Sequence, residues 1–380
     1  MVPPSASLLL ILLFASANNF SHSSPGSCTC SPFSGNPAAC CNHNDQCSHL
    51  SSSVTCKHDT PICCNSDFDS HCCPPSSACS QGCRNSLLGS CTCIPLRPSK
   101  YNESNALFSL AFVAASQCTP KGGLNNSWSC TACSKTQSLA NVIVVQKAEH
   151  LALVGYNKNR NTVVVALRGS LSFNDVIDDL KAAIMVPLPR AVAQGCTNGC
   201  QVADGFLEAV VSLQQGIEDA VTTVLALHPG CEKIVLTGHS LGAAMVPLLL
   251  SNNTAAPSIS FIHLVQRPIY TFGQPRVGNA AYAQWISNIF KRGDWYRVVH
   301  HDDPVPHLPT ASMGFVHEST EVWYSEQGVG LGHYEVCNGS GEDPQCSSGT
   351  TLSAEITDHL SYLMHPITGC QPFFSTIFNS

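Results

Sequence analysis

Charged residues are scarce in this chain, and no part of it is strongly basic. Asp, Glu, Lys and Arg make up 11% of the 380 residues, and the formal net charge is −7 at pH 7. A surface with so few cations cannot hold a polyanion by charge alone. The composition therefore excludes electrostatic binding of nucleic acid or of anionic lipid headgroups.

Apolar runs of membrane-spanning length are also lacking. The apolar block over residues 8–14 is too short to cross a bilayer, and Ala15-Ser16-Ala17 follows it directly. An apolar block before small residues is typical of a secretory signal peptide, although no Lys or Arg precedes this one. We predict a signal peptide over residues 1–17 and a secreted, extracellular protein without a transmembrane anchor.

Cysteine, in contrast, is abundant and unevenly distributed. Fourteen of the 23 cysteines lie in residues 28–93, where apolar residues show little periodicity, and nine lie in the rest of the chain. A segment with so small a core depends on disulfides, which form outside the cell. We predict a cysteine-rich module over 28–93, a linker over 94–104 and a larger domain over 105–380. The module either binds an unknown extracellular partner or is a spacer.

Within that module, the vicinal pairs Cys40-Cys41, Cys63-Cys64 and Cys72-Cys73 make its second half similar to a granulin repeat. A metal site is a weaker interpretation, because only Cys130-Thr-Ala-Cys133 has C-x-x-C spacing. We expect neither a metal nor a cofactor. N-x-S/T sequons mark candidate glycosylation sites at Asn19, Asn102, Asn125, Asn252 and Asn338.

From residue 105 onward, short β-branched runs alternate with helical patterns, which favours a mostly parallel sheet covered by helices. Residues 206–227 have helical apolar spacing and end before Pro229-Gly230. The predicted strands are residues 141–145, 151–154, 162–167, 233–236, 269–272, 295–299 and 320–324.

The strand at 233–236 leads into Gly238-His-Ser240-Leu-Gly242 and then into a run of small residues. A serine between two such glycines, after a strand and before a helix, is typical of the nucleophile elbow of an α/β-hydrolase. We therefore expect that fold, with Ser240 held out on a tight turn. The same geometry directs the backbone N–H of Leu241 toward a developing oxyanion.

A serine nucleophile needs a histidine base and a carboxylate, which in α/β-hydrolases follow in the order Ser, acid, His. The candidates after Ser240 include Asp302, Asp303 and Asp358, and the histidines include His300, His301, His307, His317, His359 and His365. The cluster from His300 to Asp303 is also open to a metal interpretation. Histidines at a strand end beside prolines are more often surface groups, however, and the residues alone leave the choice open.

Residues 101–373 resemble the class 3 lipases, the family of the secreted lipases of filamentous fungi. The resemblance lies in a series of stretches that occur in family order: 166–170, 205–206, 237–242, 271–279, 303–309, 321–324 and 358–362. It implies that Ser240 is the nucleophile, Asp303 the acid and His359 the base, because the family acid directly precedes x-Val-Pro. It also implies an oxyanion donor at Ser170, which could equally cap the next helix.

That next helix, expected over residues 171–181, is amphipathic. Phe173, Val176, Ile177 and Leu180 lie on one face and carboxylates on the other. Taken alone, such a helix packs on the surface of its domain. The resemblance implies instead a lid that covers the active site in water and moves aside at a lipid interface.

The resemblance also implies three disulfides: Cys118 with Cys370, Cys130 with Cys133, and Cys196 with Cys200. Cys337 and Cys346 are then natural partners, which leaves Cys231 as a buried thiol.

The predicted function is a secreted lipase or esterase that cleaves carboxylic esters, chiefly acylglycerols, at a lipid–water interface. A feruloyl or short-acyl esterase is the alternative within the family, and the apolar lid face disfavours it. A non-catalytic binding protein dominated by the cysteine-rich module is the alternative from another class. Loss of one member of the Ser-Asp-His set would have indicated it.

Overall fold

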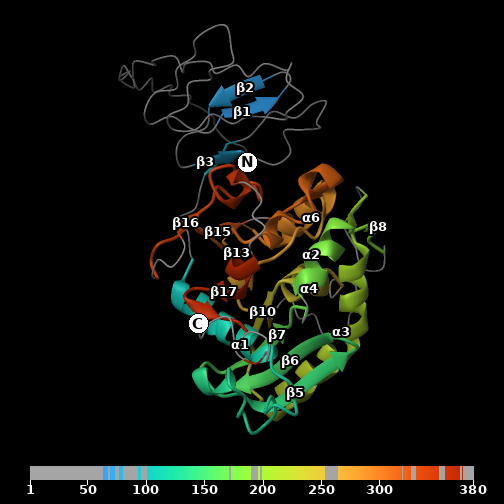
Figure 1. The fold of residues 1–380 in the computed structure, drawn as a ribbon, viewed down its shortest axis with the longest axis vertical. Helices are drawn as coiled ribbons and strands as arrows, with labels where there is room; N and C mark the ends of the chain where they lie inside the picture. The colour runs from blue at the N-terminus through green and yellow to red at the C-terminus, as the bar shows by residue number, and fades with distance from the viewer. Residues whose placement is uncertain are drawn as a thin grey trace, which may run out of the picture.

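The computed structural model describes four short strands within residues 63–95 and most of the chain from residue 101 to 370 (Figure 1). The described residues of the second part are 101–170, 173–189, 196, 199–252, 264–291, 293–318, 320–326, 331–350, 356–368 and 370, with the backbone alone for 173–176 and 252. The predicted signal peptide, Asn19 and most of the cysteine-rich module lie outside the described residues.

The described N-terminal strands form two antiparallel pairs. β1 (Cys63–Ser66) pairs with β2 (Asp69–Cys72), and β3 (Ser77–Cys79) pairs with β4 (Cys93–Pro95). β4 therefore extends two residues into the segment predicted as a linker. The first helix of the following part, α1, begins at Glu103.

An eight-stranded sheet forms the centre of the larger part, in the order β16-β15-β13-β11-β10-β7-β6-β5. All seven strands predicted from the sequence are present. The strands are β5 (Ala140–Lys147), β6 (His150–Asn157), β7 (Thr162–Leu167), β10 (Ile234–His239), β11 (Ile269–Phe272), β13 (Trp295–His300), β15 (Glu321–Tyr324) and β16 (Glu335–Val336).

The sheet is mostly parallel, as expected, because β7, β10, β11, β13 and β15 all run in one direction. The first three strands differ from the expected alternation of strand and helix: β5, β6 and β7 form an antiparallel meander. Residues 148–149 and 158–161 connect them, and a parallel crossover needs about a dozen residues.

Helices cover both faces of this sheet. α1 (Glu103–Ser116) packs on one face, and α3 (Asp204–Leu227), α4 (Leu241–Asn252) and α6 (Ala280–Ile289) pack on the other. Side chains of β7 alternate between the two: Val163 and Val165 join the α3–α4 side, whereas Val164 joins the α1 side. This layered architecture is that of the α/β-hydrolase fold.

Smaller elements surround the sheet. A four-stranded antiparallel sheet contains β8 (Met185–Pro187), β9 (Gln201–Ala203), β12 (Gly278–Asn279) and β14 (Phe315–Val316), and β17 (Ser361–Tyr362) pairs with β18 (His365–Pro366). α2 spans Phe173–Lys181. Short 3₁₀ turns are η2 (Cys133–Lys135), η3 (Val305–His307), η4 (Ala311–Met313), η5 (Ser347–Gly349) and η6 (Ile356–Leu360).

The structure joins the cysteines after residue 101 in the four pairs named from the sequence: Cys118–Cys370, Cys130–Cys133, Cys196–Cys200 and Cys337–Cys346. Cys231 is a buried free thiol. Within the described part of the chain, no helix combines the length and apolar character needed to cross a membrane.

Candidate active site

Ser240 lies at the turn between β10 and α4, where the backbone adopts a conformation that L-residues avoid. Its φ is +56°, and its N–H donates to the carbonyl of Phe272 at 3.0 Å. The side chain is fully buried, and its Oγ has no hydrogen-bond partner among the described residues. A strained backbone that presents a serine hydroxyl at the end of a parallel strand is the geometry expected of a nucleophile elbow.

Glycine is required at two positions beside this turn because backbone or side-chain atoms of other segments approach them closely. A Cβ at Gly242 would overlap the Leu167 carbonyl oxygen and lie 2.6 Å from the carbonyl carbon. A Cβ at Gly273, whose φ is +54°, would lie 2.6 Å from the Tyr362 hydroxyl and 2.7 Å from His359 Cε1. Gly242 belongs to the elbow pattern of the sequence, whereas the need for glycine at position 273 comes from residues far along the chain.

The structure brings Asp303 and His359 together although 56 residues separate them. His359 Nδ1 lies 2.8 and 3.0 Å from the two Asp303 oxygens, and both side chains are fully buried. Asp303 follows β13, and His359 lies in η6. Because the carboxylate can only accept, Nδ1 carries the proton in this pair and Nε2 is the basic nitrogen.

The competing carboxylate and histidines lie elsewhere. The Asp302 side chain is 42% exposed, while His301 Nδ1 bonds Asp358 Oδ2 at 2.9 Å. His317 is buried and donates from Nε2 to the Pro306 carbonyl, and His365 is exposed. The described groups of possible metal ligands are Cys118-Cys130-Cys370 and Glu321-Cys337-Cys346, whose cysteines all form disulfides.

Two further residues support the Asp303–His359 pair. The Tyr362 hydroxyl donates to Asp303 Oδ2, and the backbone N–H of Val305 donates to Oδ1 at 2.8 Å. His239 donates from Nε2 to the His359 carbonyl at 2.9 Å, and the two rings lie 4.3 Å apart. Burial, together with the neighbouring His359, lowers the pKa of His239 well below its ordinary range, so this ring is neutral.

The two residues expected to bind an oxyanion lie near the elbow. Leu241 is the first residue of α4, and a backbone N–H in the first turn of a helix has no partner within the helix. Ser170 is half-buried three residues beyond the end of β7, and a Cβ on its neighbour Gly169 would lie 3.1 Å from Ser240 Cβ. Both residues therefore belong to the surroundings of Ser240.

α2, the expected lid, packs against the large core cluster. Leu180 is buried in this cluster and Ile177 packs against it, while Asp178 and Asp179 are exposed. The side chains of Phe173 and Val176 lie outside the described residues. Ser240, Asp303 and His359 are all inaccessible to solvent in the structure.

Among the sequons, Asn102 and Asn125 are exposed, and Asn338 is half-buried. The Asn102 side chain caps α1 by accepting from the N–H of Asn105 at 2.9 Å. The side chain of Asn252 lies outside the described residues.

Comparison with known sequences gives a consistent family assignment. The family model "Lipase (class 3)" matches residues 164–313. A lipase of Rhizopus niveus is 30% identical over 241 residues, which are 62% of this chain and 57% of that protein. A secreted mono- and diacylglycerol lipase of Fusarium solani is 31% identical over 58% of this chain and 62% of its own length. The chain thus spans less than two thirds of both relatives.

Coverage is higher for a secreted mono- and diacylglycerol lipase of Penicillium cyclopium, which is 30% identical over 58% of this chain and 68% of its own length. Among solved structures, a triacylglyceride lipase of Rhizomucor miehei superposes with a TM-score of 0.58 at 27% identity, covering 72% of this chain and 98% of that one. Together with the elbow and the buried Asp–His pair, these matches show that the chain belongs to the class 3 lipase family.

Proposed function

We propose that this protein is a secreted serine hydrolase that cleaves the carboxylic esters of acylglycerols. The observation that carries the proposal is the buried Asp303–His359 hydrogen bond beside a strained elbow that presents Ser240. The relatives support the substrate class, because those from Fusarium solani and Penicillium cyclopium are named as mono- and diacylglycerol lipases and the one from Rhizomucor miehei as a triacylglyceride lipase.

In the proposed reaction, Ser240 Oγ attacks the ester carbonyl carbon while His359 Nε2 takes the hydroxyl proton. The backbone N–H of Leu241 and the N–H and hydroxyl of Ser170 stabilise the oxyanion that forms. Asp303 holds the proton on Nδ1 and stabilises the imidazolium. The alcohol leaves with the proton from Nε2, and water, activated by the same imidazole, then releases the fatty acid from Ser240.

We also propose that the chain is exported and that residues 1–17 are removed during export. The disulfides among the described cysteines support an oxidising environment, and the Fusarium and Penicillium relatives are named as secreted. In this organisation, a cysteine-rich module over 28–93 precedes the hydrolase domain.

Ser240→Ala is expected to remove ester hydrolysis while the protein stays folded. Loss of a triad member reduces kcat by roughly 10⁴- to 10⁶-fold. The measurement is turnover of purified protein on esters of increasing acyl length, below and above their solubility limit. Ser251→Ala is a matched control, because Ser251 is also a buried serine but lies within α4 and bonds the Pro247 carbonyl. If Ser240→Ala kept a tenth of the wild-type turnover, Ser240 would not be the nucleophile.

His359→Ala is expected to match the loss at Ser240, since nucleophile and base act as one unit. His365→Ala is the control because His365 is exposed and lies six residues along the chain. Wild-type activity in His365→Ala and none in His359→Ala is the expected pattern in the same assay. The reverse pattern would mean that His365, and not His359, is the base.

A further inference from the structure

The turn that follows Asp303 is held through four successive backbone carbonyls, from Pro306 to Pro309. His317 Nε2 donates to the Pro306 carbonyl at 2.7 Å. Arg276 supplies the rest: Nη1 donates to the carbonyls of His307 and, at 3.1 Å, of Pro309, and its backbone N–H donates to that of Leu308 at 2.9 Å. Two buried residues thus fix the segment that begins at Asp303.

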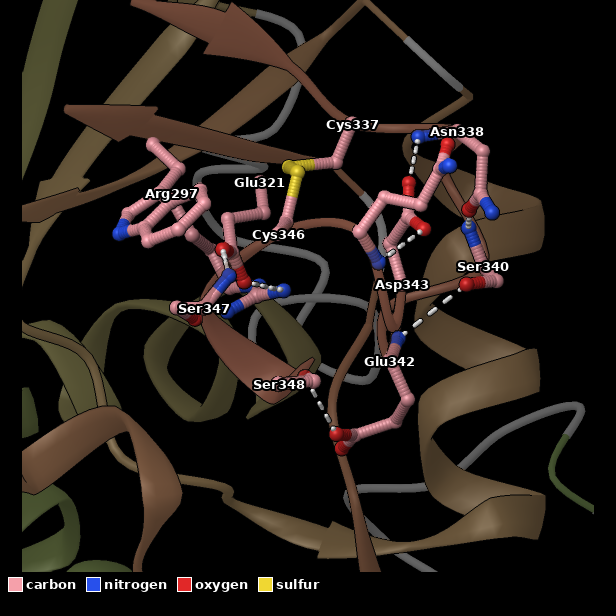
Figure 2. Close-up of a disulfide and its surroundings, with 12 residues drawn as sticks. Arg297, Glu321, Cys337, Asn338, Ser340, Glu342, Asp343, Cys346, Ser347 and Ser348 are labelled. Carbon is pink, nitrogen blue, oxygen red and sulfur yellow. Dashed lines mark hydrogen bonds and ion pairs between the residues drawn. A yellow bond between two sulfur atoms is a disulfide. The ribbon is translucent and has the colours of Figure 1, made fainter. Parts of the chain in front are cut away.

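Both of these residues are held by one carboxylate, that of Glu342. Arg276 Nε and Nη2 bond the two Glu342 oxygens at 2.7 and 2.8 Å, a bidentate arrangement that fixes the plane of the guanidinium. The backbone N–H of His317 donates to Glu342 Oε1 at 2.9 Å. Ser348 Oγ donates to Oε2 at 3.1 Å, as Figure 2 shows.

Glu342 lies in a loop whose ends are joined by the Cys337–Cys346 disulfide (Figure 2). Asp343 accepts from the N–H of Asn338 at 2.7 Å and thereby braces the loop from inside. The loop is also attached to the sheet, because Arg297 Nη2 donates to the Gly341 carbonyl at 3.0 Å. The carboxylate of Glu342 is therefore presented from a constrained backbone.

The charges of this arrangement persist over the pH range in which a histidine base works. Burial alone would raise the pKa of Glu342, but the hydrogen bonds from the Arg276 guanidinium and the His317 backbone N–H, with the charge of Arg276, lower it to about 2. Burial and the nearby Arg297 lower the pKa of His317 well below its ordinary range, so this ring is neutral and keeps its Nε2 proton on the Pro306 carbonyl.

We propose that Glu342 and Arg276 are positioning residues that set the carboxylate of Asp303 against His359. This inference rests on the proposed function. Arg276 lies close to Asp303 along the chain, because the carbonyls that it binds come four to six residues after Asp303. The intervening turn η3 begins at Val305, whose backbone N–H donates to Asp303 Oδ1. Displacing the turn by about 1 Å would move the carboxylate off Nδ1, which is enough to cost roughly 100-fold in rate.

The test compares Glu342→Gln with Asp294→Asn on a soluble short-chain ester. Both changes replace a carboxylate paired with an arginine by an amide, and Asp294 bonds Arg267 at 2.6 Å near the surface. Glu342→Gln is expected to lower kcat about 10- to 100-fold with KM changed less than about twofold. Asp294→Asn should keep wild-type kcat. Assays are run well below the unfolding temperature of each variant. If Glu342→Gln is recovered unfolded, Glu342→Asp is compared with Asp294→Asn instead.

A readout that simple destabilisation would not move is the pH dependence of kcat/KM. Asp303 stabilises the imidazolium, so a displaced carboxylate should move the acidic limb of the kcat/KM profile to lower pH in Glu342→Gln but not in Asp294→Asn. An unchanged kcat and pH profile in a folded Glu342→Gln protein would overturn the inference.

The same change is then made in an Asp303→Asn background. Because the function that Glu342 supports is already lost there, a second loss in kcat should be absent. An equal fold-loss in both backgrounds would mean that Glu342 acts independently of Asp303. If instead Asp303→Asn alone kept full activity, the acid assignment in the proposed function would fail, which separates the two failures.

Discussion

At the scale of single residues, hydrogen bonds explain how the side chain of Asp303 is accommodated without solvent. Its two oxygens accept from His359 Nδ1, the Tyr362 hydroxyl and the Val305 N–H. Charge-assisted hydrogen bonds of this kind offset the cost of burying a carboxylate. All three groups donate to Asp303, so the site favours a carboxylate, which only accepts, over an amide.

Asp303→Asn should be severe and Asp302→Asn mild. An amide at 303 has a single acceptor oxygen and presents an NH₂ group to donors, which forces His359 into the wrong tautomer. In the related serine-protease case this change costs about 10⁴-fold in kcat. The Asp302 side chain is 42% exposed, so its amide should change turnover little. The measurement is turnover on a soluble ester. Equal losses in the two variants would contradict the assignment of Asp303 as the acid.

The residues that are adjacent in the sequence to a recognisable motif could be predicted, and those that reach the site from a distance could not. Ser240 and Leu241 follow from the elbow, and the Asp303–His359 pairing follows the family order. Tyr362 and His239 lie beside predicted residues, but their bonds to Asp303 and to the His359 carbonyl depend on tertiary contacts. Nothing in the local pattern around Glu342 indicates that its carboxylate meets Arg276, 66 residues away.

At the scale of elements, predictability followed length and amphipathicity. The β-branched runs of four to six residues are strands of the central sheet, and the helix predicted over 206–227 is α3. α1 was missed because its sequence is apolar on most sides, and eight of its residues are buried, including Ser109 and Ser116. β8, β9, β12 and β14 were missed because strands of two or three residues are too short to show a period of two.

For α2 we propose the function of a lid over the active site. Phe173→Asp with Ile177→Asp places charges on its apolar face, and each charge costs kilocalories to bury at a lipid boundary. Activity on emulsified long-chain triglyceride should fall steeply while hydrolysis of a dispersed short-chain ester survives. Asp179→Asn, on the exposed face, is the control. A loss on both substrates would indicate a fixed helix whose packing was disrupted, and no loss on either would remove the lid hypothesis.

At the scale of the whole molecule, Cys118–Cys370 joins positions 252 residues apart, from just after α1 to just after β18. Closing so long a loop removes more entropy from the unfolded chain than closing a short one. This disulfide therefore restrains the domain as a unit, whereas Cys130–Cys133 spans three residues.

Cys118→Ser with Cys370→Ser should lower the free energy of unfolding by about 2–5 kcal/mol, measured by urea unfolding. Cys130→Ser with Cys133→Ser is the matched control, because Cys118, Cys130 and Cys133 are buried in the same core cluster. The control should lose less free energy of unfolding, since its disulfide closes only a short loop in similar packing. Equal losses would mean that local packing, and not loop closure, accounts for the stabilisation.

Because Ser240, Asp303 and His359 are completely buried, the proposed opening of this site can be measured by a covalent label. A serine-directed phosphonate in solution can react only with molecules whose site is exposed at that moment. Its inactivation rate therefore equals the intrinsic rate of the open form multiplied by the fraction of molecules that are open. Comparing this rate in plain buffer and with detergent micelles would measure how far an interface shifts the equilibrium, without any substrate being consumed.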